Sequence, residues 1–277
     1  MSKPELAKWF SETGPTEGHG RGYVHPNTDE KVYGVTSISG RYSEGVGKGE
    51  NPLAQYAADV TLRWANENWN LLGSRSDEQN YRNGRFRWKD WTNHLAQIGT
   101  DAHDYIEEDL NGRELPIMWG EALEVAEQWV KFRTNHWLDP EAVEVTVWNR
   151  TLGYAGTLDI SGYLDGVLTL LDVKTSRALR ENHRLQVAAL AKAEFLMVKH
   201  EDGSWTEEPM PEWEQFGFVH LRPDYYNPVN GNGEEAYWEL QFIDPDEVDD
   251  LFEIFTGLLR GKIAEDRLKA RRKERAA

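Results

Sequence analysis

The sequence of 277 residues contains no cysteine. Disulfide bonds, zinc sites with thiolate ligands and iron–sulfur clusters are therefore excluded, because all of them need cysteine side chains. Long hydrophobic runs are also missing, and without a stretch of about 18 apolar residues we expect no membrane span. The segment from Met1 to Gly22 is polar and carries acidic groups, which is not the pattern of a secretory signal.

Positive charge is scarce as well. The 31 Lys and Arg residues face 48 Asp and Glu residues, which gives a net charge of −17. This balance argues against a general DNA-coating protein, because nonspecific binding to DNA relies on basic side chains. The apolar fraction of 39% is nevertheless large enough for a hydrophobic core, and the length suits one large domain or a core with a helical extension.

The N-terminal part is predicted to be mainly helical. Residues 1–32 are rich in Gly, Pro and charge and are expected to form an irregular lead-in. Residues 33–138 form the predicted helical region. Its elements are a β-like stretch from Lys31, a Gly-rich loop at 39–51, and helices at about 52–69, 88–111 and 119–137.

From residue 139 to residue 277 the pattern predicts an α/β core that ends in a C-terminal helix. Alternating apolar and polar residues indicate strands, and wider apolar spacing indicates helices. The predicted order is strands at 142–149, 155–164 and 167–174, a helix at about 181–198, a polar loop at 200–213, strands at 216–221 and 236–242, and a helix at 244–274.

A hairpin is predicted between the second and third of these strands. Asp165-Gly166 lies between two β-like runs, which is a strong signal for a two-residue hairpin turn. This turn fixes the pairing of the two strands, so Leu164 should lie opposite Val167.

The same register brings charged residues together. Counting outward from the turn, Asp159 should lie opposite Asp172, with Cβ atoms ~5 Å apart on one face. Lys174, two residues after Asp172, should share that face and lie opposite Thr157. Two facing carboxylates destabilise a sheet unless a charge compensates them, and their hard oxygen ligands suit Mg²⁺ or Mn²⁺. The cation would activate a water molecule, and Lys174 would orient it, deprotonate it or stabilise the developing charge.

The alternative is an ordinary hairpin with a surface pair of Asp172 and Lys174 and a solvated Asp159. The neighbouring residues are apolar on both faces, which favours a buried site over this alternative. They are Leu158, Ile160, Leu170, Leu171 and Val173.

Two further residues are candidates for this site. His103 and Glu107 are four residues apart and share one helix face. A lone His on a helix is usually structural, but the preceding Gly99-Thr100 and the later acids favour metal ligation. Glu144 lies on the face of the first core strand opposite its valines, where it either reaches the metal site or faces solvent.

Basic residues occur in three groups. One group mixes Arg with aromatic residues, which fits contacts to phosphates and unpaired bases, or equally a solvated basic face beside a core stripe. Another follows Lys174 and either contacts a phosphate backbone or lines a helix terminus. The tail from Arg267 to Arg275 is interpreted as a solvated charge run. The candidate DNA-binding residues are Arg82, Arg85, Arg87, Trp88, Arg177 and Arg184.

Several of these motifs occur together in a known family. Gly156-Thr157-Leu158-Asp159 followed by Asp172-Val173-Lys174 resembles the PD-(D/E)XK nucleases, in particular the RecB-like branch with its phage and mitochondrial exonuclease relatives. Three other segments fit the same branch in the same order, and the resemblance covers roughly residues 33–195. These segments are Tyr33 to Ile38, Gly99 to Glu107, and Asn182 to Gln186.

The resemblance implies a restriction-endonuclease-like core, which is a central mixed β-sheet flanked by helices. It implies a Mg²⁺ or Mn²⁺ site formed by His103, Asp159, Asp172 and the Val173 carbonyl, with Lys174 as the catalytic amine. Gln186 would orient the substrate or the lysine. The residues expected to support this site are Glu107, Glu144 and Thr175.

This sequence departs from the family pattern in three places. The second acid is often Glu in the family and is Asp172 here. Leu190 stands where a Tyr often follows the Gln, so the role of that Tyr is in doubt. Many members hold an iron–sulfur cluster through four cysteines, so this chain would belong to the cluster-free group.

The implied function is a metal-dependent DNA exonuclease that hydrolyses phosphodiester bonds with a metal-activated water, in recombination, repair or phage DNA processing. Its substrate would be a DNA end, its candidate partners a single-strand annealing or recombination protein and further copies of itself, and its location the cytoplasm of a bacterial or phage-infected host cell. Two alternatives stay open. One is an endonuclease of the same fold, and the other is a catalytically retired DNA-binding or assembly protein.

Overall fold

The computed structural model describes residues 8–9, 22–42, 61–62, 65, 78–200, 202–223 and 237–276. The predicted helix at 52–69 therefore lies outside the described residues, except for positions 61, 62 and 65, which are helical. Most of the predicted loop at 39–51 also lies outside them.

Ten strands of the described residues form one mixed sheet. Its order is β1-β2-β3-β5-β4-β7-β8, while β6 pairs with β5 and β9, and β9 pairs with β10. Most neighbours are antiparallel, but the β3–β5 and β6–β9 pairs are parallel. The strands are β1 (Lys8–Trp9), β2 (Gly22–Val24), β3 (Lys31–Gly34), β4 (Leu138–Asn149), β5 (Tyr154–Leu164), β6 (Val167–Lys174), β7 (Phe195–Lys199), β8 (Trp205–Pro209), β9 (Gln215–Arg222) and β10 (Tyr237–Ile243).

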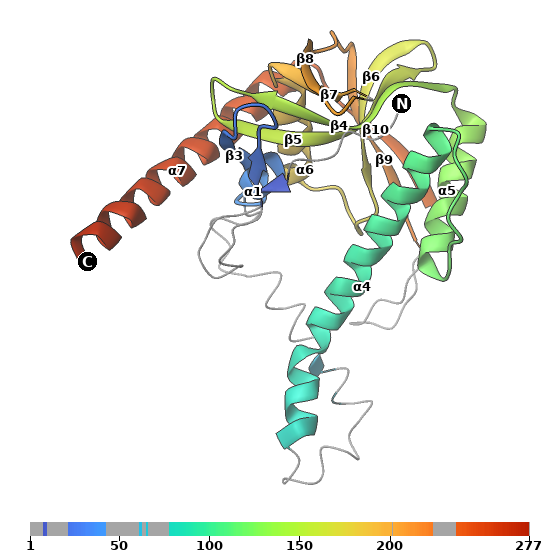
Figure 1. Cartoon of the computed structure of the whole chain (residues 1–277). Helices are drawn as coiled ribbons and strands as arrows, with labels where there is room; N and C mark the ends of the chain where they lie inside the picture. Colours follow the sequence, from blue (N-terminus) through green and yellow to red (C-terminus); the bar gives the residue numbers. More distant parts are fainter. Residues whose placement is uncertain are drawn as a thin grey trace.

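Helices flank the sheet and pack against two separate hydrophobic cores (Figure 1). In one core, α4 and α5 pack through Ile106 and Trp129 against Leu171 of β6. In the other, α1, α6 and α7 pack against β5, β6 and β9, with Leu190 and Phe255 fully buried. The predicted mixed sheet flanked by helices is confirmed. The helices are α1 (Val35–Ser39), α4 (Glu78–Leu110), α5 (Glu121–Asn135), α6 (Glu181–Ala191) and α7 (Glu247–Ala276).

None of the helices in the described part of the chain combines the length with the apolar character that crossing a membrane would need.

Three predictions of secondary structure are wrong. The lead-in at 1–32 contains β1 and β2, while β3 begins at Lys31 as predicted. The helix predicted to run to residue 198 ends at Ala191, and its last part is β7, because a short apolar run fits a buried strand as well as a helix. The polar loop at 200–213 contains β8, which pairs with β7 at the edge of the sheet.

The predicted hairpin register is confirmed up to a definite point. Leu164 pairs with Val167, and the ladder continues to Ile160 opposite Leu171. Asp165 and Gly166 have φ angles of 48° and 90°, the left-handed values that a tight hairpin turn requires.

Candidate metal centre

The β5 strand has two different neighbours along one of its edges. While β4 pairs with the whole of β5 on one side, β3 pairs only with Tyr154 and Ala155, and β6 only with the residues from Ile160 onward. Among the described residues, none of residues 156–159 pairs with β3 or β6. Asp159 is thus the last residue of this gap, and the ladder ends one pair before the predicted opposition of Asp159 and Asp172.

Beyond the last backbone pair of β5 and β6, the side chain of Asp159 connects the two strands. Its Oδ2 atom accepts a hydrogen bond from the backbone N–H of Val173 at 2.7 Å. The predicted opposition of Thr157 and Lys174 is wrong, because the pairing of β5 with β6 ends at Ile160 and Leu171, while Lys174 stays paired with His220 of β9. The β6 strand leaves β5 at this point and continues beside β9.

On the other side of Asp159, Glu144 interrupts the regular pairing of β4. Val143 pairs with Ile160 and Val145 with Leu158, so Glu144 lies opposite Asp159. Its φ angle is 53°, a left-handed value that costs a residue with a side chain roughly 1–2 kcal/mol. Such strain persists where the surrounding structure fixes it, and it often marks functional sites.

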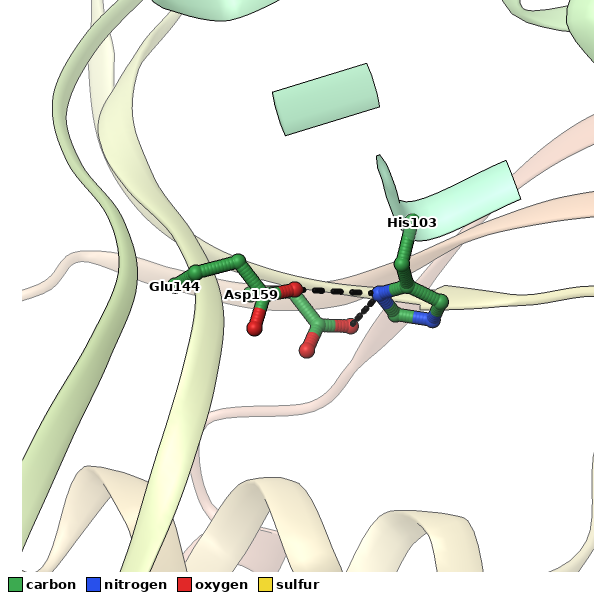
Figure 2. Close-up of side chains that lie close together, drawn as sticks. All are labelled: His103, Glu144 and Asp159. Atoms are coloured by element: carbon green, nitrogen blue, oxygen red, sulfur yellow. Dashed lines mark hydrogen bonds and ion pairs between the residues drawn. The ribbon is translucent and has the colours of Figure 1, made fainter. Parts of the chain in front are cut away.

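Glu144, Asp159 and His103 form a compact cluster (Figure 2). His103 Nδ1 lies 3.1 Å from Glu144 Oε1 and 3.8 Å from Asp159 Oδ2. One ligand atom from each of the three residues lies within 4.8 Å of the other two. The cluster therefore joins α4 to two adjacent strands of the sheet.

Glycine at position 99 allows α4 to approach the sheet closely. A Cβ atom added at Gly99 would lie 3.2 Å from the Thr175 hydroxyl, just after Lys174. Gly99 is one helical turn before His103, so this contact helps to place the imidazole beside the carboxylates. One turn further on, Glu107 is buried and forms an ion pair with Arg113 at 3.0 Å.

The second carboxylate of the predicted site forms an ion pair. Asp172 Oδ2 lies 2.5 Å from Lys174 Nζ, and Asp172 is fully buried. Beside Lys174, His220 is also buried, and its Nε2 donates to the Ser176 carbonyl at 2.6 Å. His220 thereby fixes the chain just after Lys174.

Burial and charge shift the pKa values of these groups. Burial raises the pKa of Asp159, and it raises the pKa of Asp172 to about 6 against the opposing charge of Lys174. Burial alone would lower the pKa of Lys174, but the charge of Asp172 raises it, so the amine is an ammonium at neutral pH. Burial also opposes protonation of His103, yet the charge of Asp159 and the hydrogen bond to Glu144 raise its pKa to about 9.

These observations fit a hard divalent cation. The half-buried Glu144 lies opposite the buried Asp159, and the protonated imidazole of His103 supplies positive charge beside the two carboxylates. The carboxylate oxygens suit Mg²⁺ or Mn²⁺, and the imidazole nitrogen would complete the set of ligands. The cluster contains Glu144 and does not contain Asp172. The predicted roles of Asp172 and of the Val173 carbonyl as metal ligands stay predictions.

The other candidate residues lie in varied surroundings. Arg184 forms an ion pair with Glu247 at the start of α7, which neutralises its charge. Gln186 is half-buried on α6, and Arg177 is exposed in the segment after β6. The side chains of the α4 candidates lie outside the described residues, and these candidates are Arg82, Arg85, Arg87 and Trp88.

Two histidines near Lys174 were not predicted as functional residues. His220 becomes its neighbour only through the parallel pairing of β6 and β9, which no local pattern in the sequence announces. Burial and the charge of Lys174 lower the pKa of His183 to about 3, so its ring is neutral. In the sequence, the only indication of a role for His183 was its position in the segment from Asn182 to Gln186, which resembles the family.

We expect cation binding to strengthen as the pH rises from 7 towards 9. His103 must lose its proton to act as a ligand, and its raised pKa means that the proton is bound at neutral pH. Release of one proton gives at most about a tenfold gain in Mg²⁺ affinity per pH unit. Calorimetric titration of Mg²⁺ at several pH values measures this slope. A His103→Gln variant should lose the slope, and an equal slope in both proteins would contradict the assignment.

Comparisons with known proteins find a distant structural likeness and no match to a family model or a curated protein. Among solved structures, the crystal structure of LHK-Exo in complex with dAMP is similar over 80% of this chain and 98% of that chain, with 13% sequence identity and a TM-score of 0.32. At this level the likeness carries no functional inference.

Proposed function

We propose that this chain is a divalent-metal-dependent deoxyribonuclease that degrades DNA from an end. The observation that carries the proposal is that a set of possible cation ligands and a lysine ammonium lie side by side at the gap in the sheet. A cluster of His103, Glu144 and Asp159 that could hold a cation lies beside the half-buried ammonium of Lys174. Lys174 is close enough for its charge to influence both His103 and Asp159.

The residues of the chain have distinct roles in this proposal. His103, Glu144 and Asp159 would hold the cation, while the Val173 N–H fixes the orientation of the Asp159 carboxylate. A bound Mg²⁺ or Mn²⁺ acts as a Lewis acid, which activates water and offsets the charge of a phosphate group. Lys174 is an ammonium with a raised pKa, so it can donate hydrogen bonds to a phosphate oxygen but cannot accept a proton.

This protonation state favours one role for Lys174 among the three that the sequence left open. An ammonium held by Asp172 is a preorganised positive charge, which stabilises the negative charge that develops on phosphorus-bound oxygens. Hydrolysis would add the oxygen of water to phosphorus and break the bond to the 3′-oxygen, leaving a 5′-phosphate. Asp172 keeps the ammonium in position and raises its pKa.

The long α4 helix supports a substrate that enters by an end. The helix places His103 at the gap in the sheet and extends well beyond the body of the protein (Figure 1). It therefore covers one side of the cluster. A continuous duplex would have to pass this helix, whereas a free end would not.

The proposal predicts metal-dependent loss of end-labelled linear DNA, with closed circular DNA left intact. The assay compares Mg²⁺, Mn²⁺ and a chelator on both substrates. Cleavage of the circle would replace the exonuclease with an endonuclease. Absence of cleavage from both substrates at every cation concentration would favour a retired site.

A matched pair of glutamates on β4 provides the control. Glu144→Gln should reduce cleavage by roughly 10–100-fold, the usual cost of weakening a metal site. Glu141→Gln changes the same strand at an exposed position outside the cluster, and should leave cleavage unchanged. Equal effects of the two substitutions would contradict the assigned role of Glu144.

A further inference from the structure

The last part of α7 is an exposed basic arm that leaves the body of the protein (Figure 1). Buried α7 residues such as Phe255 and Leu259 pack on the sheet, and the last buried residue is Lys262. Every residue from 267 to 275 is exposed. We call these residues the basic arm, and its charged members are Arg267, Lys269, Arg271, Arg272, Lys273, Glu274 and Arg275.

The arm begins directly after a polar anchor. Lys262 Nζ lies 2.6 Å from Asp266, and the Tyr33 hydroxyl donates to the same carboxylate at 2.9 Å. Arg41 forms an ion pair with Glu265 at 2.6 Å. These contacts fix α7 against β3 and the segment after α1, so the helix axis beyond them has a defined direction.

Packing does not account for the arm. It has no buried face, and a short helix without tertiary contacts is only marginally stable in water. Like charges also lie four residues apart at Arg267 and Arg271 and again at Lys269 and Lys273, where they repel each other. A polyanion would relieve this repulsion.

The arm has the opposite charge to the rest of the chain. Its six basic residues and one acidic residue give it a charge of +5. Since the net charge of the whole chain is −17, the rest of the chain has a charge of −22. Several basic side chains of the body are matched by acids, as in the pairs of Arg150 with Glu207 and Lys192 with Asp249. Within the described part of the chain, no ion pair is found for the six basic residues of the arm.

We infer that the basic arm binds the phosphate backbone of duplex DNA outside the active site, independently of base sequence. The inference rests on the proposed function for its choice of polyanion. At 1.5 Å per residue the nine residues span about 14 Å, which corresponds to about four steps of a DNA strand. Because the basic side chains surround the helix, they suit phosphate contacts that position a duplex rather than contacts that read bases.

The test is binding of a fluorescent 25-base-pair duplex to the full-length protein in the presence of a chelator, at several salt concentrations. Arg271→Gln/Arg272→Gln should weaken binding by about tenfold at low salt and reduce the slope of log affinity against log salt by about 2. Lys131→Gln/Arg260→Gln removes the same charge from exposed positions on the body and should leave both values unchanged.

Three results would overturn the inference. These are an unchanged slope in the arm variant, an equal loss in the body variant, or a change only in the sedimentation mass of the arm variant. The last result would identify the acidic body of a second copy as the partner. Since the chelator prevents cleavage, the test is independent of the proposed activity. If the arm variant shows the expected loss of affinity and slope but the wild type shows no Mg²⁺-dependent cleavage, the proposed nuclease activity is refuted and the role of the arm is not. If the wild type cleaves DNA but the arm variant binds like the wild type, the role of the arm is refuted and the nuclease activity is not.

Discussion

Asp159→Asn is expected to abolish metal-dependent cleavage, with a loss of at least roughly 10³-fold. Asp159 is the carboxylate at the end of the β5–β6 ladder and lies in the cluster with His103 and Glu144. Asn keeps an oxygen that can accept the Val173 N–H, so the fold should persist. It removes the negative charge that a divalent cation requires. The increase in melting temperature caused by Mn²⁺ should therefore disappear together with the activity.

The same hairpin offers a control of identical chemistry. Asp165→Asn also removes a carboxylate, but at the turn, where a left-handed residue is needed and Asn tolerates that conformation. This variant should keep both cleavage and the Mn²⁺-dependent increase in melting temperature. If Asp159→Asn also kept them, the cluster would not be the metal site.

Lys174→Met should affect stability and activity together. Cleavage should fall by roughly 10²–10³-fold, since a preorganised charge is removed. The free energy of unfolding at pH 8 should fall by about 3–5 kcal/mol, because the fully buried Asp172 loses its ion-pair partner. The measurements are urea unfolding and the linear-DNA assay.

A second substitution separates the two effects. Asp172→Asn in the Lys174→Met background removes the unpaired charge, so most of the stability should return while cleavage stays lost. Burial raises the pKa of Asp172 to about 6 even beside the charge of Lys174, which lowers it. Without the amine the pKa lies higher still, so in the variant Asp172 is protonated at pH 5 and its ionisation costs stability as the pH rises. The stability loss in Lys174→Met should therefore be smaller at pH 5 than at pH 8. A loss that is equal at both pH values, or that persists in the double variant, would contradict this account.

Local signals in the sequence were sufficient for the hairpin. Asp165-Gly166 specifies a turn with two left-handed residues, and strand alternation then fixes every pair up to Ile160 and Leu171. The same counting fails beyond that pair. There β6 separates from β5 while it stays paired with β9, its neighbour from Thr169 to Lys174. Where two paired strands separate depends on contacts with chain segments far apart in the sequence, which the turn does not specify.

The role of Glu144 also could not be settled from the sequence. Its face of the strand was predicted, and the sequence left open whether it reached the site. The answer depends on a left-handed backbone conformation opposite Asp159, for which a glutamate gives no local signal. Arg184 shows the opposite case, because its basic side chain suggested DNA contact while folding matched it with Glu247. Charge partners across elements are decided by packing.

The three residues of the cluster belong to two different layers of the protein. His103 lies on α4, while Glu144 and Asp159 lie on strands of the sheet (Figure 2). A cation held by all three would act as a noncovalent cross-link between the helical layer and the sheet, in addition to the hydrophobic contacts of Ile106 and Trp129. By mass action, such a cation stabilises only the arrangement in which α4 is docked. The concentration of free cation would then set how firmly the helical layer is attached, as well as whether the site is complete.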